Sequence, residues 1–393
     1  MEKQVLAAAL QSREAFNKIR TLTTKKDFTD ISAELWTLIA RFYDLDQDAT
    51  HVELDLFKQI IVEEIPRHSD IILLELDALS DTSVPNLVQE LIKLKKKSIS
   101  EDIITELASN PLSDKAATLM DDYQEVEIDQ IDDIEPAGDI AHDMLVELSN
   151  PENQIKLYPT IINEAIDGGV IGGNHVLIFA RPNCGKTMFN INCVRGMARD
   201  GHKVLHLINE EPRKQLLLRY INRCSGLSKR EVYADIDGAI ERARENGLNN
   251  IFIEDINPGT FNEVRGLIER IKPDVVVLDQ LRNMTVKEES RVKGLEKLAT
   301  EARNLAKRYG VLGISVTQAG DSATNKLVLT DSDIDSSKTG IPAQCDLILG
   351  LGVDETQRSQ SMRTLTIVKN KITNIHEYYP VRVDENLSKI VSM

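Results

Sequence analysis

The segment Ala180–Thr187 has the residue types and spacing of a phosphate-binding loop. It matches the pattern G-x-x-x-x-G-K-[ST] at every fixed position except the first, where Ala180 replaces glycine. Gly185 lets backbone amides approach a phosphate, and the start of the following helix adds partial positive charge there. Lys186 is expected to reach the β- and γ-phosphates, and the Thr187 hydroxyl to bind Mg²⁺. The residues expected to bind the nucleotide are Ala180, Arg181, Pro182, Asn183, Cys184, Gly185, Lys186, Thr187 and Met188.

Carboxylates follow two apolar runs downstream of this loop. Glu210 and Glu211 come after the run 203–208, where a carboxylate would polarise the water that attacks the γ-phosphate. The alternative is that the two acidic residues only favour the start of a helix. We favour Glu210 over Glu211 as the general base. Asp279 ends the run 275–278, which is the Walker B arrangement, and is expected to hold Mg²⁺.

Gln318 and two long polar segments are candidates for coupling the nucleotide site to a bound nucleic acid. Gln318 follows the run 311–317, where an amide would sense the γ-phosphate; the alternative is an ordinary polar residue at a strand end. The segments 282–293 and 319–340 are poorly periodic, and loops of this length in a compact domain are usually functional or disordered. They lack interleaved aromatic residues, so contact with nucleic acid would be mainly with phosphate and sugar. The candidate DNA contacts are Arg291, Lys293, Lys326 and Lys338.

Lys369 and Lys371 alternate near the end of a late apolar run, which places both on one side of a strand. A site that already contains Lys186 rarely needs two more lysines from its own chain. We therefore expect them to reach the nucleotide of an adjacent subunit, as a trans-acting finger does. The alternative is an edge strand that lysines protect from pairing.

Short apolar runs that alternate with helical patterns carry these residues. Such alternation predicts an α/β domain with a mostly parallel sheet, buried on both faces, with its ligand at the carboxyl ends of the strands. The predicted strands are 175–179, 203–208, 250–253, 274–278, 311–316, 347–349 and 365–368.

The remaining chain divides by composition into two further parts. Residues 1–105 show helical periodicity and predict an all-α interaction domain, with a basic run at 93–97 that is either a solvated helix face or a DNA or partner contact. Residues 106–150 predict a linker with a short helix near 117–120 and an acidic stretch. Residues 151–393 are then the ATPase domain.

Composition excludes several classes of protein. The 393 residues carry a net charge of -16, which argues against a generally basic nucleic-acid coat but not against a local basic channel. The 4 cysteines lack C-x-x-C spacing, so neither a zinc site nor a disulfide framework is expected. No run is long and apolar enough to span a membrane, and no signal-peptide pattern is present. We expect a cytoplasmic protein.

The motifs together resemble the DnaB-type replicative DNA helicases, in the small form that bacteriophages carry. The glycine-rich approach, the P-loop, Glu210, Asp279, Gln318, Asp346 and the Lys369/Lys371 strand occur in the order of that family, and the segments 2–10 and 27–28 resemble the start of its helical domain. The resemblance implies a RecA-like P-loop ATPase core with a parallel sheet, preceded by a small all-α N-terminal domain.

The same resemblance implies a role for each site residue. Lys186 and Thr187 would bind ATP and Mg²⁺, Glu210 would be the general base, and Asp279 the Walker B acid. Gln318 would couple the γ-phosphate to the DNA loops. Lys369 and Lys371 would act on the ATP of the neighbouring subunit. Because Lys371 stands where the family usually has an arginine, and lysine lacks the bidentate fork, hydrolysis is expected to be slower.

The family also implies assembly and partners. Its members form hexameric rings that thread single-stranded DNA, step along it in the 5'–3' direction and unwind the duplex at the fork. The segment 103–120 would pack on the next subunit, and a primase and a helicase loader are candidate partners. The alternatives are a RecA-like recombinase or recombination mediator, and an ATP-dependent loading scaffold that does not unwind DNA. The all-α N-terminal domain favours the helicase.

Overall fold

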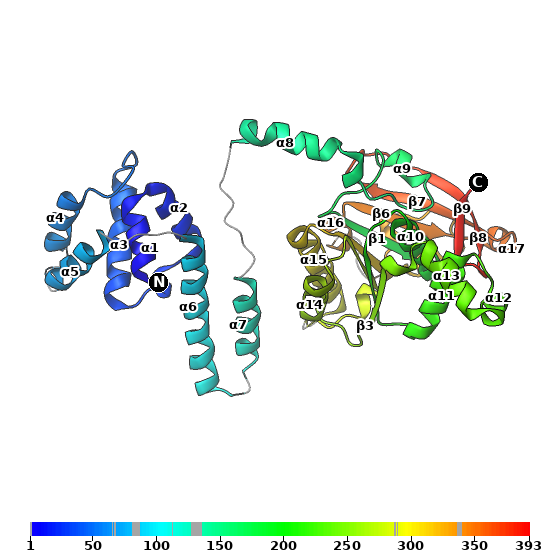
Figure 1. Ribbon diagram of the computed structural model, residues 1–393, viewed down its shortest axis with the longest axis horizontal. Coiled ribbons are helices and arrows are strands. Elements are labelled where there is room, and N and C mark those ends of the chain that lie inside the picture. Colours follow the sequence, from blue (N-terminus) through cyan, green and yellow to red (C-terminus); the bar gives the residue numbers. More distant parts are fainter. Residues whose placement is uncertain are drawn as a thin grey trace. The chain divides into compact units, whose positions relative to one another are not determined.

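The chain forms two compact units, Met1–Pro136 and Ala137–Met393 (Figure 1). The computed structural model describes residues 2–64, 66, 68–80, 87–111, 113–126, 136–286, 288, 290–335 and 340–393. Within this part of the chain, no helix is long and apolar enough to cross a membrane. The two units meet between residues 136 and 137, so the domain boundaries at 105 and 150 stay a prediction.

The first unit is helical, as its periodicity predicts. Its helices are α1 (Glu2–Gln11), α2 (Arg13–Leu22), α3 (Asp30–Leu45), α4 (Leu54–Glu64), α5 (Ser69–Ser80), α6 (Leu87–Ser109) and α7 (Asp114–Glu125), with a 3₁₀ turn η1 (Lys25–Asp27). The apolar stripes of α1 and α3 form its core: Leu6, Leu35 and Ile39 are each no more than 1% exposed. The Tyr43 hydroxyl donates a hydrogen bond of 2.9 Å to the Ala9 carbonyl and so ties α3 to α1.

Most cations of the basic run on α6 have partners within this unit. Lys95 lies 3.1 Å from Asp27, and Lys97 lies 3.0 Å from Glu2. These two pairs join α6 to η1 and α1. The run therefore contributes contacts within the helical unit, and the two roles considered from sequence, a solvated face or a DNA or partner contact, stay predictions.

The region predicted as a linker contains more helix than expected. The short helix predicted near 117–120 is the middle of α7, and α8 (Ala137–Ser149) covers the end of the acidic stretch. The side chains of Met144, Leu145, Val146 and Leu148 on α8 are all at least 50% exposed. Composition alone misses α8 because, within the described part of the chain, none of its residues is buried.

The second unit is an α/β domain built around one sheet. Its strands are β1 (His175–Ala180), β2 (Val204–Ile208), β3 (Ile251–Asp255), β4 (Val275–Asp279), β5 (Leu312–Gln318), β6 (Leu347–Gly352), β7 (Met362–Asn370), β8 (Tyr378–Asp384) and β9 (Lys389–Ser392). The helices after α8 are α9 (Ile162–Ala165), α10 (Lys186–Arg199), α11 (Arg213–Ser225), α12 (Lys229–Ala234), α13 (Ile236–Glu245), α14 (Phe261–Ile271), α15 (Arg291–Tyr309), α16 (Gly340–Ala343) and α17 (Glu355–Ser359). Short 3₁₀ turns are η2 (Pro151–Asn153), η3 (Leu248–Asn250), η4 (Leu281–Asn283), η5 (Asp321–Ala323) and η6 (Asp331–Asp333).

The strand order is β3-β2-β4-β5-β1-β6-β7-β8-β9. The strands from β3 to β6 in this order are parallel, and β7, β8 and β9 continue the sheet antiparallel. The mostly parallel sheet predicted from the alternating runs is confirmed, while β8 and β9 were not predicted. The strands β2, β4, β5 and β1 are neighbours in the sheet and run parallel. Their carboxyl ends, which carry the candidate site residues, therefore lie at one edge of the sheet.

The two faces of the sheet bury alternate residues of each strand. Val176 and Ile178 of β1 pack into one core with Phe189 of α10, whereas Leu177 and Phe179 pack into another with α14 and α15. This period of two explains why the strands read as continuous apolar runs. Helix α15 begins at Arg291, inside the segment 282–293 that the sequence indicated as a loop, and Ser290 caps it through a hydrogen bond from the Lys293 amide.

Candidate nucleotide-binding site

The predicted phosphate-binding loop joins the end of β1 to the start of α10. β1 ends at Ala180, and α10 begins at Lys186 directly after Gly185. Gly185 has a φ of 102°, a conformation that side chains with a Cβ rarely adopt, and a Cβ there would lie 2.8 Å from Met188 Cε. The glycine in this position is therefore required by the geometry of the turn into the helix.

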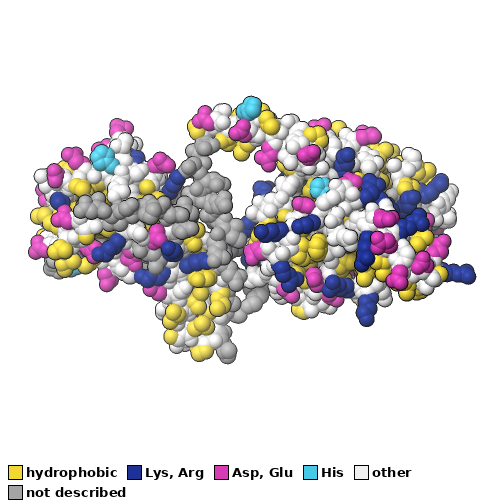
Figure 2. All heavy atoms as spheres, in the orientation of Figure 1, with side chains coloured by type: hydrophobic (Ala, Val, Ile, Leu, Met, Phe, Trp, Pro, Cys, Tyr) yellow, Lys and Arg dark blue, Asp and Glu magenta, His cyan; other side chains and the backbone are white. Residues whose placement is uncertain are grey.

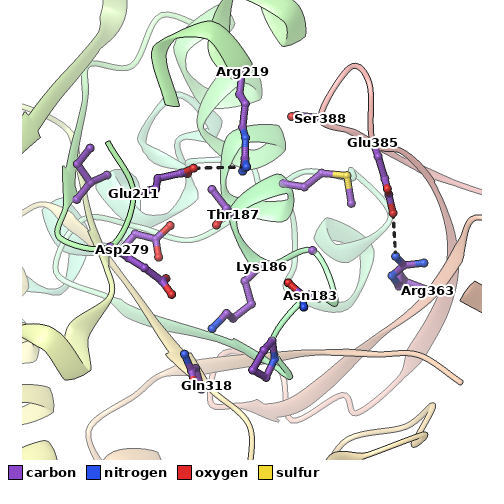
Figure 3. Close-up of a pocket in the computed structure, with 15 residues that line it drawn as sticks. Asn183, Lys186, Thr187, Glu211, Arg219, Asp279, Gln318, Arg363, Glu385 and Ser388 are labelled. Carbon is purple, nitrogen blue, oxygen red and sulfur yellow. Dashed lines mark hydrogen bonds and ion pairs between the residues drawn. The ribbon is translucent and has the colours of Figure 1, made fainter. Parts of the chain in front are cut away.

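A cavity of about 620 Å³ opens in front of this loop (Figure 3). The volume is within the range of small-molecule sites, roughly 300–1,000 Å³. Of the residues expected to bind nucleotide, Pro182, Asn183, Gly185, Lys186, Thr187 and Met188 line it. The candidate catalytic and metal-binding residues Glu210, Asp279 and Gln318 line it too, although they come from three other strands. The fold thus brings together the groups that the sequence places after β1, β2, β4 and β5.

The other three residues of the loop do not line the cavity. Ala180 and Cys184 are buried, at 0% and 4% exposure. Arg181 turns away, towards Asp321 at 2.9 Å and the Ala319 carbonyl at 3.3 Å. Because these three side chains do not line the cavity, we expect only their backbone to contact a nucleotide.

Lys186 has the environment of a phosphate-binding lysine. Its side chain is 8% exposed, and burial lowers its pKa, opposed by the charges of Glu210 and Asp279. Within the described residues, no carboxylate lies within ion-pair distance of it. Because a buried ammonium group is costly without an anion, the site fits a nucleotide phosphate as its partner.

Asp279 ends β4 and lines the cavity together with Thr187. It is 6% exposed and accepts a hydrogen bond of 3.2 Å from the Asn190 amide of α10. The Nε2 atom of His206 on β2 lies 3.7 Å from the same carboxylate. One carboxylate and one hydroxyl that face a phosphate cradle are the protein ligands that Mg²⁺ typically has in nucleotide sites. The donor set therefore fits Mg²⁺.

Glu210 and Glu211 both line the cavity but differ in their contacts. Glu211 pairs with Arg219 of α11 at 3.4 Å, and burial raises the pKa of Glu211, opposed by the charge of Arg219. Glu210 is exposed to the cavity and accepts a hydrogen bond from the side chain of Gln280. The backbone of Gln280 is in turn held by Asn209, whose side chain accepts from its amide at 2.8 Å and donates to its carbonyl at 3.0 Å.

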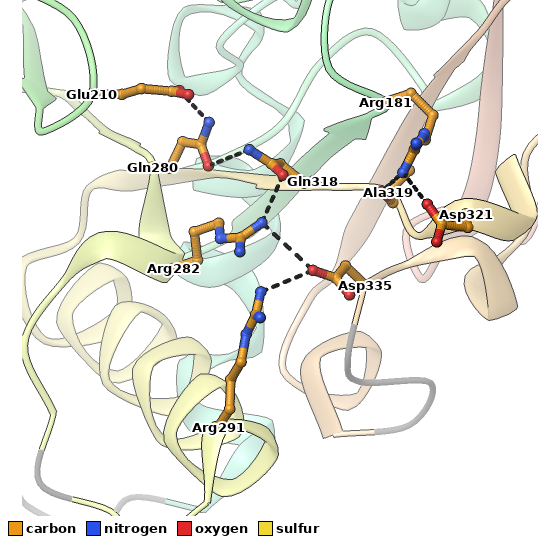
Figure 4. A network of polar contacts seen from close by, with 9 residues as sticks. All are labelled: Arg181, Glu210, Gln280, Arg282, Arg291, Gln318, Ala319, Asp321 and Asp335. Atoms are coloured by element: carbon orange, nitrogen blue, oxygen red, sulfur yellow. Dashed lines mark hydrogen bonds and ion pairs between the residues drawn. The ribbon is translucent and has the colours of Figure 1, made fainter. Parts of the chain in front are cut away.

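Side chains beyond Glu210 form a chain of hydrogen bonds (Figure 4). Gln318 Nε2 donates to Gln280 Oε1 at 3.5 Å, and Arg282 Nη1 donates to Gln318 Oε1 at 2.7 Å. Arg282 also lies 3.5 Å from Asp335, which is 3.0 Å from Arg291. The sequence placed Arg282 and Asp335 in the two long polar segments and did not single out Gln280; only the fold shows that the three residues belong to one network.

The four candidate DNA contacts have different surroundings. Arg291 and Lys293 both lie in the first turn of α15. Lys293 is exposed, and Arg291 pairs with Asp335, which follows η6. Lys326 pairs at 2.6 Å with Asp333, whose side chain is 1% exposed, so its role in the structure is to fix the loop. Lys338 lies outside the described residues. On the face that Figure 2 shows, cations are interleaved with acidic side chains and do not form one basic surface.

Lys369 and Lys371 lie far from their own cavity. β7 ends at Asn370, which pairs with Leu347 at the start of β6, and Lys371 follows in a turn. Lys371 lies 3.3 Å from Asp346, whose carboxylate also accepts from the His175 amide at the start of β1. Lys369 donates to the Pro342 carbonyl. Both lysines are thus at the amino ends of the parallel strands, whereas the P-loop is at their carboxyl ends.

The antiparallel strands contribute residues that the sequence did not predict. Arg363 of β7 is 2% exposed and donates to the Cys184 carbonyl of the P-loop at 3.0 Å. It also contacts Glu385 at 3.3 Å, in the turn between β8 and β9. Glu385 and Ser388 line the cavity beside Arg363 (Figure 3). An arginine beside the apolar run 365–368 is the only signal in the sequence, and it does not indicate which group the arginine contacts.

Residues 162–379 match the family model of the DnaB-like helicase C-terminal domain, which is more than half of the 393 residues. The chain belongs to this family. The matched residues include the whole cavity except the turn between β8 and β9. The resemblance to DnaB-type replicative helicases, drawn from the order of the motifs, is confirmed.

Individual relatives are distant. The chain is 23% identical over 241 residues to the DNA repair protein RadA of Mycolicibacterium smegmatis, covering 60% of this chain and 45% of that protein. It is 22% identical over 242 residues to the DnaB-like replicative helicase of Enterobacteria phage T4, covering 56% of this chain and 51% of that protein. The chain thus spans about half the length of the curated relatives it matches.

Solved structures share the fold. A structure described as that of a DnaB-like replicative helicase and its interactions with primase matches with a TM-score of 0.62 at 18% identity, covering 100% of this chain and 99% of that chain. A solved ATPase domain matches with a TM-score of 0.58 at 19% identity, covering 66% of this chain and 100% of that chain. The predicted RecA-like α/β core, preceded by a helical region, is confirmed.

Proposed function

We propose that the protein is an ATP-driven replicative DNA helicase, which hydrolyses ATP while it moves along single-stranded DNA and separates the duplex at the fork. The observation that carries this proposal is the cavity in which Lys186, Glu210, Asp279 and Gln318 meet, in a chain of the DnaB-like family. Each of them ends or follows a different parallel strand, where an α/β sheet binds its ligand.

Each residue of the cavity has a separate role in ATP hydrolysis. The amides of the P-loop and the ammonium group of Lys186 bind the phosphates and stabilise the charge that develops on the γ-phosphate. Thr187 and Asp279 would hold Mg²⁺, which when bound would supply further neutralisation of that charge. Glu210 accepts a proton from the attacking water, and Gln318 contacts the γ-phosphate and transmits its presence to the segments that follow β4 and β5.

Assembly as a homohexameric ring completes the site. Lys369 and Lys371 lie at the edge of the sheet away from their own cavity, which supports their action on the nucleotide of a neighbouring subunit. The exposed apolar side chains of α8 and the exposed Ile104 and Met120 of the α6–α7 region offer surfaces for packing between copies. Such packing would cover apolar area that otherwise faces water.

The DNA side of the proposal depends on the first turn of α15. Arg291 and Lys293 lie at this helix N-terminus, where the helix dipole disfavours cations unless an anion binds them. Asp335 is that anion for Arg291 within the chain, and a phosphate of single-stranded DNA would supply it for Lys293. We propose 5'–3' movement, and a primase and a helicase loader as partners, by analogy with the family.

The experiment that tests the function is separation of a forked DNA duplex by the wild type and by Lys186→Ala, with ATP and Mg²⁺. The wild type is expected to release the labelled strand, and Lys186→Ala, which removes the phosphate-binding ammonium group, to release none. If the wild type hydrolyses ATP on single-stranded DNA but never separates strands, the helicase is excluded. A filament in electron micrographs would then favour a recombinase, and a ring would favour a loading scaffold.

A further inference from the structure

The hydrogen bonds that link the side chains of Arg282, Gln318, Gln280 and Glu210 all have a fixed donor-to-acceptor direction. A guanidinium group can only donate hydrogen bonds and an ionised carboxylate can only accept them. The Gln318 amide must therefore turn its oxygen to Arg282 and its nitrogen to Gln280, and the Gln280 amide must turn its nitrogen to Glu210. All donors point the same way, from a cation to an anion, and bonds in such a chain strengthen one another.

Gln280 occupies the middle of this chain and has little freedom. It is 1% exposed, and Asn209 holds its backbone at both the amide and the carbonyl. Its side-chain nitrogen is bonded to the carboxylate that we propose as the general base. A carboxylate that accepts this bond is held towards β4 and has one lone pair fewer for the attacking water.

The far end of the chain is an anion site that this protein fills with its own carboxylate. Asp335 lies between two guanidinium groups, 3.5 Å from that of Arg282 and 3.0 Å from that of Arg291. Its side chain is 31% exposed and that of Arg291 is 58% exposed, so the pair is open to solvent. The backbone keeps Asp335 in place, because its amide donates to the Gln318 carbonyl at 3.1 Å.

We propose that Gln280 is a positioning residue that restrains Glu210, and that a nucleic-acid phosphate releases the restraint by replacing Asp335 between Arg282 and Arg291. A phosphate offers more acceptor oxygens and more charge than one carboxylate, so it draws Arg282 out of its bond to Gln318. Once Arg282 leaves, the chain loses the cation that orients both amides. Gln318 then turns to the γ-phosphate, and Glu210 becomes free to hold the water. This inference rests on the proposed function, since it requires a nucleic-acid-dependent ATPase.

The test measures ATP turnover with and without a single-stranded oligonucleotide for the wild type and Gln280→Met. Methionine keeps the length of the side chain and removes both hydrogen-bonding groups, so it fills the same space. The turnover of Gln280→Met without oligonucleotide is expected to rise to the stimulated rate of the wild type, and the ratio of the two rates to fall to about 1. Arg282→Ala breaks the chain at its other end and should give the same ratio, and the double variant should match the single ones.

Asp335→Asn tests the anion site separately. Removal of the competing carboxylate should lower the oligonucleotide concentration for half-maximal stimulation about two- to fivefold, the effect of one partly exposed ion pair, without changing the maximal rate. Gln360→Ala, at an exposed glutamine after α17, is the matched control and should behave as the wild type.

The outcomes separate this inference from the function on which it rests. If the oligonucleotide fails to stimulate the wild type, the proposed function is wrong. If the wild type is stimulated but Gln280→Met and Arg282→Ala keep the wild-type ratio, or turn over more slowly without oligonucleotide while remaining folded, the restraint does not exist. If Gln280→Met does not fold, Arg282→Ala and Asp335→Asn still decide between these outcomes.

Discussion

Replacement of Arg363 by methionine tests how the antiparallel strands support the P-loop. The guanidinium group donates to the Cys184 carbonyl at 3.0 Å and to the Met362 carbonyl at 2.7 Å from a side chain that is 2% exposed. Burial lowers its pKa, opposed by the charge of Glu385. Methionine has a similar length and no donor, so the change removes the hydrogen bonds with little change in volume. A hydrogen bond to a charged group contributes roughly 1.5–3 kcal/mol.

This loss should appear in both stability and nucleotide binding. For a unit of this size, 1.5–3 kcal/mol lowers the unfolding temperature by about 3–12 °C. Because the Cys184 carbonyl is part of the P-loop, the Kd of ATP should rise about tenfold, which corresponds to about 1.4 kcal/mol. Calorimetry gives the first value and titration with a fluorescent ATP analogue the second. Arg382→Met, at an exposed arginine of β8, is the control and should change neither. Unchanged ATP affinity in a destabilised Arg363→Met protein would refute the support of the P-loop by this residue.

Three other changes have expected outcomes. Lys371→Arg should raise ATP turnover severalfold, because arginine adds a bidentate fork at the neighbouring nucleotide; a steady-state assay in which turnover does not rise would contradict action in trans. Asn209→Ala should lower the unfolding free energy by roughly 1–3 kcal/mol in urea titrations, because two backbone groups of Gln280 lose their partner. Burial raises the pKa of Glu211 above 4.5, so this carboxyl stabilises the fold at lower pH, and the contribution is lost as the pH rises through its folded pKa. Glu211→Gln, which can still pair with Arg219, should therefore gain in unfolding temperature relative to the wild type as the pH increases; a constant difference between pH 4 and pH 8 would exclude this effect.

The sequence predicts the parallel part of the sheet because each of its strands is a short apolar run. Such runs are buried on both faces, so their identity does not depend on the strand order. The strands β8 and β9 are harder to find, since one face of β8 is exposed and Arg382 and Asp384 interrupt its apolar residues. Helix α8 escapes prediction for a related reason: its apolar side chains face solvent in the isolated chain.

The sequence predicts only those site residues that belong to recognisable motifs. Lys186 and Asp279 line one cavity, as a P-loop and a strand-end carboxylate do at fixed positions in an α/β sheet. Gln280 and Arg363 act through tertiary contacts, and neither spacing nor periodicity indicates such a contact. Lys326, predicted as a DNA contact, is also paired with the buried Asp333, a partner that its polar surroundings in the sequence do not indicate.

ATP turnover per chain, measured against protein concentration with and without a single-stranded oligonucleotide, tests the central claim most directly. A site completed by Lys369 and Lys371 of a neighbour, and coupled to DNA through Gln318, predicts that turnover per chain rises with protein concentration and rises again with oligonucleotide. Turnover that is constant over dilution to the monomer and indifferent to the oligonucleotide would contradict it.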